Sequence, residues 1–390
     1  MKILKLTFKG LPNFNKELDI NFVACQRVND EDKEQLCNVF SNIYVNKVLS
    51  FVGINASGKT TILKAISFAM KMLNNESLNN IKSKEILNGL KSDKPLIITS
   101  FFSDYSYVYK LKTCINKKNN STDGSDKFVI SNEFLWAKDF GRVKTKKSLF
   151  DFKSSDLKEQ RDPNERYLME DISIIAALNK EKEDGFFVQD MLEWTDHNML
   201  NVLGYFPKEL LSFLDPSIER LEGSVDGKKV EIRLKFLGED EIILNSIITL
   251  QNYLSSGTIK GLGVFVSALL AFNEGGYLII DEIENHFNRE IVATLIRFFM
   301  DANVNKKGAT LLFSTHYSEL LDEFERNDCI YIVRNRAGIS AENLSDVLKR
   351  NDIKKSEVYN SDYLGGTVPA YESYMALKKV LASLEMAEEL

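Results

Sequence analysis

The sequence predicts an α/β fold with a mixed sheet, in which parallel core strands are accompanied by an antiparallel β lobe. Three stretches carry this prediction. An apolar strand, a glycine-containing loop and a helix follow one another from Lys47 to Met70, and helices alternate with strands from Gly261 to Val333. Between them, Leu96–Trp136 is rich in β-branched and aromatic residues. Alternation of helix and strand is typical of a parallel sheet with covering helices, whereas aromatic and β-branched runs separated by turns are typical of antiparallel strands.

Composition bounds the class of protein. The 390 residues are 44% hydrophobic and 27% charged, as in a soluble globular protein of one large or two to three ordinary domains. A net charge of −6 argues against bulk attraction to nucleic acid or to an anionic membrane, although a local basic groove stays open. The four cysteines, at positions 25, 37, 114 and 329, show no paired spacing, so neither a zinc knuckle nor a disulfide framework is predicted.

The N-terminus and the apolar runs indicate a cytoplasmic protein with no membrane partner. Residues 1–8 lack the apolar core and the small-residue cleavage site of a secretory signal. The longest apolar run, Gly261–Phe272, is too short to cross a bilayer, so no membrane span is expected.

The N-terminal lobe is predicted to cover residues 1–152. Met1–Phe8 and Leu18–Val23 alternate like a hairpin, and a polar connection leads from them to the strand Val48–Val52 and the helix Thr61–Met70. Three antiparallel strands then follow, at Leu96–Phe102, Tyr105–Thr113 and Lys127–Trp136.

Residues 153–225 are predicted to be a helical insertion that contacts another subunit or a partner, because apolar residues recur at helical spacing there. These residues are Leu168, Ile172 and Ile175, and then Phe187, Met191 and Trp194. A C-terminal lobe is expected over 226–345, opening with strands in Lys229–Leu244. Residues 346–390 form a tail that ends in an amphipathic helix, Tyr371–Met386.

The loop after Val52 fits the pattern of two glycines separated by four residues and followed by Lys and Thr. Gly53 and Gly58 allow backbone N–H groups to point inward, Lys59 adds a positive charge for the outer phosphates, and Thr60 offers a hydroxyl to Mg²⁺. The following helix aims its positive end at the phosphates. The predicted nucleotide-binding set is Gly53, Asn55, Ala56, Ser57, Gly58, Lys59, Thr60 and Thr61.

A second motif is the apolar run Tyr277–Ile280, which ends in Asp281 and Glu282 and precedes a helix at Asn288–Ala302. At the carboxyl edge of a sheet, Asp281 would reach the Mg²⁺ shell and Glu282 would polarise an attacking water. Phosphoryl transfer needs mainly positioning and charge neutralisation, so this pair of carboxylates suits it.

A third motif, Ser255-Ser256-Gly257-Thr258, stands before the apolar helix Gly261–Phe272. Locally it is a serine-capped helix start. The functional alternative is a second γ-phosphate site, made by Ser255, Ser256 and Gly257 and facing a nucleotide held by another subunit.

Leu254–Thr258 resembles the signature motif of ABC-type ATPases in their SMC/RecF/OLD branch, and the order of the motifs matches that family. The resemblance implies an ABC-type ATPase head that binds ATP and Mg²⁺. It implies a homodimer, or a higher even-numbered oligomer, in which two subunits sandwich two nucleotides. It also implies that His316, which follows the apolar strand Ala309–Ser314, contacts the γ-phosphate, and that the segment of His286 reaches the dimer partner. The catalytic set is then Lys59, Glu282 and His316, with Thr60 and Asp281 as metal ligands. For the family's metal-sensing glutamine, Asn132 and Glu133 are the candidates, and neither is assigned.

Finer features, Asp281–Asn285 and Tyr363–Pro369, resemble stand-alone ATPases of bacterial phage-defence and abortive-infection operons, akin to the ATPase half of OLD nucleases. The few dozen residues after the ATPase core are too few for a nuclease domain, so a separate effector, a nuclease or a toxin, is expected. The alternative is a RecF-like ATPase of DNA repair that clamps duplex DNA. A scaffold that binds ATP without hydrolysing it is disfavoured by Glu282 and His316, and a transporter subunit is disfavoured by the insertion.

Overall fold

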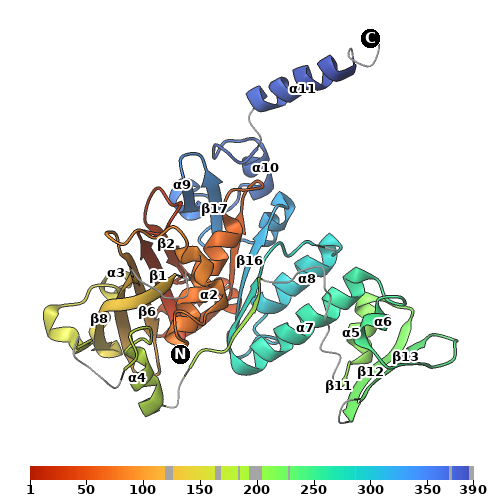
Figure 1. The fold of residues 1–390 in the computed structure, drawn as a ribbon, viewed down its shortest axis with the longest axis horizontal. Helices are drawn as coiled ribbons and strands as arrows, with labels where there is room; N and C mark the ends of the chain where they lie inside the picture. The colour runs from red at the N-terminus through yellow and green to blue at the C-terminus, as the bar shows by residue number, and fades with distance from the viewer. Residues whose placement is uncertain are drawn as a thin grey trace.

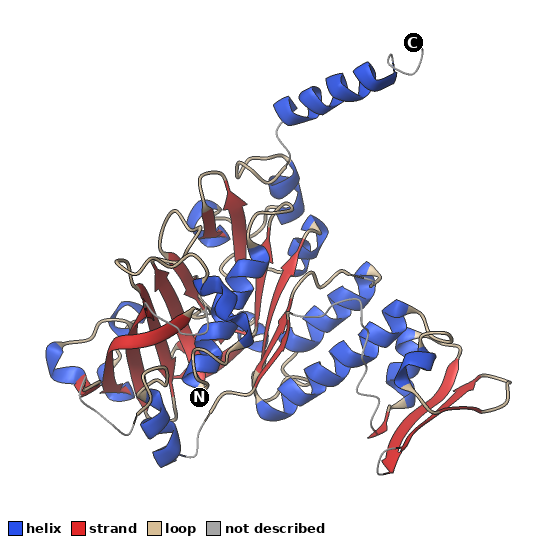
Figure 2. Ribbon diagram, viewed as in Figure 1, coloured by secondary structure: helices blue, strands red, loops and turns tan. Residues whose placement is uncertain are grey.

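The computed structural model describes residues 1–118, 126–162, 168–182, 185–192, 204–226, 229–285, 287–368 and 371–385. Within these residues, strands form two six-stranded sheets, a four-stranded sheet and a short hairpin of β3 (Leu36–Phe40) and β4 (Ile43–Asn46). Helices cover the sheets (Figures 1 and 2). The predicted α/β class, with a parallel core and an antiparallel lobe, is confirmed.

The central sheet has the order β10-β15-β16-β5-β17-β18, and its neighbours are parallel except for the pair β17 and β18. All five side chains of β5 are buried, as expected for an apolar strand covered on both faces. The strands are β5 (Val48–Val52), β10 (Val188–Met191), β15 (Tyr277–Ile280), β16 (Thr310–Thr315), β17 (Ile330–Asn335) and β18 (Ile339–Asn343).

Helix α2 (Lys59–Leu73) packs on one face of the central sheet, and α7 (Ser256–Glu274) and α8 (Arg289–Met300) pack on the other (Figure 1). Side chains all around α2 are buried, because the antiparallel sheet lies on its far side and shares one hydrophobic core with it. In contrast, α8 is strongly amphipathic and turns only one face to the sheet. These helices confirm the three predicted from the apolar spacing.

The antiparallel sheet has the order β2-β1-β6-β7-β8-β9 and contains the strands predicted for the N-terminal lobe except Val48–Val52, which is β5 of the central sheet. Two buried tyrosines join it to the central sheet: the N–H of Ile3 donates to Tyr277 Oη at 2.7 Å, and the N–H of Asn21 donates to Tyr331 Oη at 2.7 Å. The strands are β1 (Lys2–Lys9), β2 (Leu18–Asn21), β6 (Leu96–Ser103), β7 (Tyr107–Lys118), β8 (Lys127–Asp139) and β9 (Leu157–Gln160).

The segment 153–225 is less helical than predicted. It holds α4 (Ile175–Lys182) and α5 (Lys208–Leu214), but its strand β9 joins the antiparallel sheet and β10 joins the central sheet. The four-residue spacing of Phe187 and Met191 fits a helix, yet a short apolar run cannot be told from a buried strand by periodicity. Trp194 lies outside the described residues. The predicted domain limits stay a prediction.

A small sheet with its own core packs on the first turns of α7. Its order is β11-β12-β13-β14, and its apolar side chains meet Leu254, Ile259 and Leu262 around the start of α7. The elements are β11 (Gly204–Tyr205), β12 (Ile218–Asp226), β13 (Lys229–Phe236), β14 (Ile242–Leu244) and α6 (Ile247–Leu250). The strands predicted in Lys229–Leu244 are therefore present, within a sheet that begins upstream of them.

Helix α7 is longer than the apolar run Gly261–Phe272 from which it was predicted. It is the one helix in the described part of the chain that is long and apolar enough to cross a bilayer by length and composition. However, 56% of its apolar window is buried inside the protein, as in the core helix of a globular fold.

Short elements complete the chain. In the N-terminal 160 residues these are α1 (Asp32–Gln35), η1 (Lys82–Leu87), η2 (Phe140–Arg142), α3 (Lys146–Leu149) and η3 (Ser154–Asp156). Those near the C-terminus are η4 (Ser318–Glu323), α9 (Leu344–Val347), α10 (Lys355–Asn360) and α11 (Tyr371–Glu385). Helix α11 confirms the predicted terminal helix and stands away from the rest of the protein (Figure 1).

Gly276 is required for β10 to pair with β15. A Cβ on Gly276 would lie 2.4 Å from the carbonyl oxygen of Phe187, the residue that precedes β10. We predict that Gly276→Ala lowers the free energy of unfolding by about 1–3 kcal/mol, because backbone must move to relieve the overlap. Gly185→Ala is the matched control, since its Cβ would make only an ordinary contact of 3.5 Å. Denaturant unfolding of both variants measures the difference; equal stability would contradict this placement of β10.

Candidate active site

Three neighbouring strands deliver the predicted motifs to one edge of the central sheet. Strands β15, β16 and β5 are adjacent and parallel, so their carboxyl ends meet there. The phosphate loop follows β5, the acid pair follows β15, and His316 follows β16. They surround a cavity of about 380 Å³ lined by Asn55, Ala56, Ser57, Gly58, Lys59, Thr60, Thr61, Glu282, His316 and Ile339.

The phosphate loop depends on its two glycines. A Cβ on Gly53 would lie 2.5 Å from the carbonyl oxygen of Val333 in β17. Gly58 has φ +102° and caps α2 without a side-chain hydrogen bond. The first N–H groups of α2 therefore face the cavity without a capping side chain, which is the arrangement that binds phosphate at a helix N-terminus.

Lys59 lies buried at the floor of this loop. Its ammonium donates to the carbonyl oxygens of Gly53 at 2.9 Å and Ile54 at 3.2 Å, and lies 3.2 Å from His316 Nδ1. Burial lowers the pKa of Lys59, and the nearby carboxylates of Glu284, Asp281 and Glu282 oppose that shift. The ammonium is thus the positive charge at the centre of three acids.

Thr60 and Asp281 offer hard oxygen ligands side by side. The Thr60 hydroxyl donates to Asp281 Oδ2 at 2.6 Å, and the hydroxyl of Ser314 donates to Asp281 Oδ1. A hydroxyl and a carboxylate fit Mg²⁺, which prefers oxygen ligands and takes its remaining ones from water and substrate phosphates. Within the described residues, no group of three or more His, Cys, Asp or Glu side chains could hold a metal alone. The residues therefore fit a metal that is bound together with a nucleotide.

Glu282 is held as an ionised carboxylate. Its backbone is left-handed, with φ +47°, and its N–H donates to Ser314 Oγ at 2.7 Å. Burial alone would raise the pKa of Glu282, but hydrogen bonds from Asn285 Nδ2, at 2.7 Å, and from His316 outweigh burial and lower it. A strained, ionised carboxylate at the rim of a phosphate cavity can accept a proton from water.

His316 connects the acid and the lysine. Its Nε2 lies 3.4 Å from Glu282 Oε1, and its Nδ1 faces the Lys59 ammonium. One neutral tautomer satisfies both contacts, with Nδ1 accepting from Lys59 and Nε2–H directed at Glu282. The backbone N–H of His316 donates to Glu284 Oε1 at 2.5 Å, which fixes the turn after β16.

Two residues that were not predicted from the sequence form hydrogen bonds to residues of the site. Ser314, fully buried near the end of β16, bonds both Asp281 and Glu282 through one hydroxyl. Asn335, at the end of β17, donates from Nδ2 to the carbonyl oxygen of Ala56 at 3.2 Å. The available signal for Ser314 was its place near the carboxyl end of a buried strand, directly before Thr315 and His316.

Ser255, Ser256 and Gly257 do not line the cavity of their own chain. Ser255 caps α7 by accepting a hydrogen bond from the N–H of Thr258 at 3.0 Å, which confirms the predicted serine-capped helix start. Ser255 and Ser256 are exposed. Because α7 leads directly into the start of β15, its N-terminus points toward the carboxyl edge of the sheet (Figure 1).

The other residues considered from the sequence either lie away from the cavity or lie outside the described residues. Glu133 is completely buried in β8, bonded to the hydroxyls of Thr113 and Ser173 and to the N–H of Ile174, and burial raises its pKa. It belongs to the antiparallel lobe rather than to the phosphate cavity, and Asn132 is its neighbour on the same strand. His286 and His197 lie outside the described residues.

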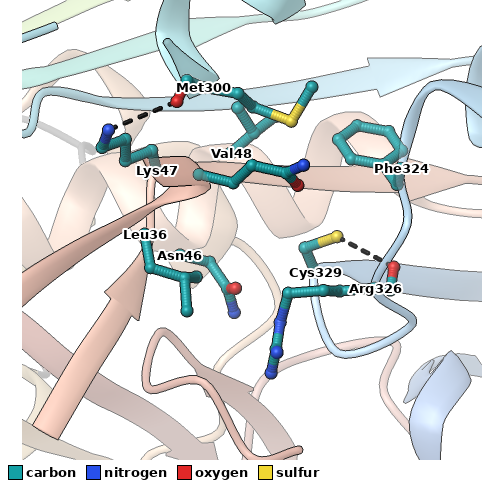
Figure 3. Close-up of a pocket in the computed structure, with 9 residues that line it drawn as sticks. Leu36, Asn46, Lys47, Val48, Met300, Phe324, Arg326 and Cys329 are labelled. Atoms are coloured by element: carbon teal, nitrogen blue, oxygen red, sulfur yellow. Dashed lines mark hydrogen bonds between the residues drawn. The ribbon is translucent and has the colours of Figure 1, made fainter. Parts of the chain in front are cut away.

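A smaller cavity lies at the opposite end of β5. It measures about 10 Å³, and Lys47 and Cys329 in its wall donate to the carbonyl oxygens of Met300 and Arg326 (Figure 3). A space of this size admits about one water molecule.

Comparison with protein families agrees with this geometry. Residues 48–322 match the family described as "AAA domain, putative AbiEii toxin, Type IV TA system". The chain belongs to this family. Its match contains the phosphate loop, the acid pair and His316, and it supports a P-loop ATPase. No curated protein matches the chain. Among solved structures, the SMC head domain from Thermotoga maritima matches at 11% identity over 88% of this chain and 99% of that one, with a TM-score of 0.39.

We predict that Ser314→Ala lowers the ATPase kcat by about tenfold or more with little change in nucleotide affinity, because both acids lose their shared anchor. Ser50→Ala is the matched control: Ser50 is equally buried in the adjacent strand β5, and its hydroxyl has no partner among the described residues. Steady-state hydrolysis and calorimetric binding of a non-hydrolysable analogue separate the two effects. Equal rates of ATP hydrolysis for the two variants would contradict a role of Ser314 in the site.

Proposed function

We propose that this protein hydrolyses ATP to ADP and phosphate in the cavity formed by the phosphate loop, Asp281, Glu282 and His316. The observation that carries the proposal is that Lys59, Thr60, Glu282 and His316 line one cavity, while Asp281 accepts a hydrogen bond from Thr60 beside it. Phosphoryl transfer requires little covalent chemistry from a protein, so positioned positive charge, a metal and an aligned water suffice.

Each side chain then has one role. The N–H groups at the start of α2 and the Lys59 ammonium hold the phosphates, while Thr60 and Asp281 hold Mg²⁺, which when bound neutralises phosphate charge. Glu282 accepts a proton from water as the water oxygen bonds to the γ-phosphorus and the bond to the leaving ADP oxygen breaks. His316 orients Glu282 through Nε2 and keeps the tautomer set by Lys59.

Removal of the loop ammonium tests this chemistry. We predict that Lys59→Ala weakens ATP binding by about tenfold or more and abolishes hydrolysis, because a charge-assisted contact to phosphate is lost. Lys64 lies on the same helix, pairs with Glu85 and does not line the cavity, so Lys64→Ala should bind and hydrolyse as the wild type does. Unchanged hydrolysis by Lys59→Ala would refute the whole scheme.

We further propose that two copies close on two nucleotides, with Gly53–Thr61 of one copy and Ser255–Gly257 of the other around each. The exposure of Ser255 and Ser256, and the direction of α7 toward the carboxyl edge, support this arrangement. The N-terminus of a second copy's α7 would bring further N–H groups and a positive dipole end to the outer phosphate. ATP would then favour the closed pair by binding it more tightly than the open one.

A slow-hydrolysis variant and a mixing experiment test the pair. With ATP·Mg²⁺, Glu282→Gln should have the molar mass of a dimer in light scattering. This variant binds the nucleotide but does not activate water, so the ATP-bound pair is not opened by hydrolysis. Lys59→Ala and Ser255→Arg should each be inactive alone. Mixed, they should recover about a quarter of the wild-type rate, because half of the random dimers are mixed and one of their two sites is intact.

The mixing result distinguishes shared sites from separate ones. If each chain hydrolysed ATP alone, Ser255→Arg would stay active and mixing would add nothing. A mixture of Lys59→Ala with Glu282→Gln is the control, because both defects lie on the phosphate-loop side of the proposed site; each site of the mixed dimer then keeps one defect and should stay inactive.

The biological setting follows from the same switch. We propose that the nucleotide state controls a separate effector, a nuclease or a toxin, in bacterial anti-phage defence. The description of the matched family names a putative toxin and a toxin–antitoxin system, which supports an association with a toxin. The Glu282→Gln and Lys59→Ala variants provide ATP-bound and ATP-free forms with which to test binding of the protein encoded by a neighbouring gene.

A further inference from the structure

The outer face of the antiparallel sheet carries two lysines interleaved with two aromatic rings. In the register of the sheet, Lys110 lies opposite Trp136 and Lys112 lies opposite Phe134, on strands β7 and β8. Directly opposed residues share a face, so these four side chains form one patch, which we call the lysine–aromatic face. All four are partly exposed, whereas the intervening residues Leu111 and Leu135 point into the core.

The rings and the lysines of this face are in contact. The rings of Phe134 and Trp136 have centroids 5.8 Å apart and planes inclined by 30°. Lys110 Nζ lies 4.8 Å from the Trp136 centroid and 6.0 Å from that of Phe101. The residues from Phe150 to Phe152 cover Phe101 and Lys138 at one end of the sheet, which leaves the part around Phe134 uncovered by them.

Among the described residues, no ion pair balances the two lysines of this face. Neither Lys110 nor Lys112 forms an ion pair with any described residue, and Asp19, on the same face, is engaged by Lys5 at 2.6 Å. Residues 96–160 contain twelve Lys and Arg but eight Asp and Glu, although the whole chain carries −6. Burial lowers the pKa of Lys110, and the neighbouring charge of Lys112 lowers it further. An anion placed here would relieve that repulsion.

We propose that the lysine–aromatic face binds single-stranded nucleic acid, with bases stacked on Phe134 and Trp136 and phosphates held by Lys110 and Lys112. Aromatic platforms flanked by lysines are the arrangement that binds single strands without sequence preference. An acidic peptide would use the lysines but has no use for the ring pair, and a duplex does not offer its bases for stacking. The proposal is independent of the nucleotide cavity, which lies on the central sheet.

Tryptophan fluorescence gives a direct readout. The chain has two tryptophans, so Trp194→Phe leaves Trp136 as the reporter. An oligothymidylate of about 20 nucleotides should quench Trp136 and bind in fluorescence anisotropy, with affinity that falls as salt rises from about 50 to about 200 mM. A duplex of the same length and polyglutamate serve as competitors. Weak competition by both is expected; displacement by either at equal concentration would overturn the proposal.

Charge and ring variants place the binding site. Lys110→Glu/Lys112→Glu should weaken binding by about tenfold or more and lower the slope of log affinity against log salt by about 1.4, two contacts at 0.7 each. Phe134→Ala should weaken it by about tenfold while leaving the salt slope unchanged, since it removes stacking alone. Lys349→Glu/Lys354→Glu, exposed near α10, is the matched charge control and should bind as the wild type does.

Folding and the ATPase provide the remaining checks. Each variant should keep the wild-type circular dichroism and ATPase rate, because none touches the phosphate cavity. If a variant loses both, the conservative pair Lys110→Gln/Lys112→Gln repeats the measurement. Absence of quenching in the single-tryptophan protein, or equal loss of binding in the control double variant, would overturn the proposal.

Discussion

Parallel pairing of β15, β16 and β5 is the constraint on which the site depends. The pairing places Ile280 beside Phe313 and Ser314 beside Phe51, so Asp281 emerges next to Ser314 at the edge where the phosphate loop begins. Side chains alternate along a strand, and a slip of one residue would turn Ser314 to the other face. Its hydroxyl could then bond neither Asp281 nor the N–H of Glu282. The apolar runs that bury these strands therefore also set the distances between polar groups that share no stretch of sequence.

Charge at the cavity determines what a bound triphosphate would require in addition to Lys59. Asp281, Glu282 and Glu284 surround this single ammonium, and Glu284 is itself buried and occupied by the N–H of His316. A triphosphate entering beside three carboxylates would be repelled if Lys59 were its only counter-charge. The N–H groups of α2 supply positive potential without adding a side chain. A divalent ion held by Thr60 and Asp281 would supply further positive charge, and Asp281 would then act as its ligand instead of repelling the phosphates.

Much of the fold and most of the intramolecular site could be predicted from the sequence, because β5, β15 and β16 are largely apolar runs and α2 and α8 carry apolar residues at helical spacing. The residues that follow these strands were placed by topology, since parallel strands end at one edge. Strand β10 was predicted as part of a helix, because Phe187 and Met191 are four residues apart. A strand of only four residues is too short for its own two-residue alternation to be recognised. Glu133 illustrates another limit: a polar residue in a strand gives no sign of whether it faces a site or a buried network of hydroxyls. The contribution of Ser255 to a shared site depends on a second copy, which one sequence does not display.

Helix α7 bears on that last question, because it belongs to both hydrophobic cores. Its first turns, with Ile259 and Leu262, pack under the small sheet, and its later residues Val264 and Phe265 pack into the main core. At 19 residues it is about 28 Å long, and it passes through Gly275 and Gly276 directly into β15. Ser255 and Asp281 are thus the two ends of one packed helix–strand unit. The small sheet packs on the N-terminal end of that unit. Ser255 is therefore held at a fixed position relative to Asp281 and Glu282, although it lies outside the cavity that they border. A second copy that met the N-terminus of α7, as proposed above, would therefore meet a surface whose position is already fixed by packing.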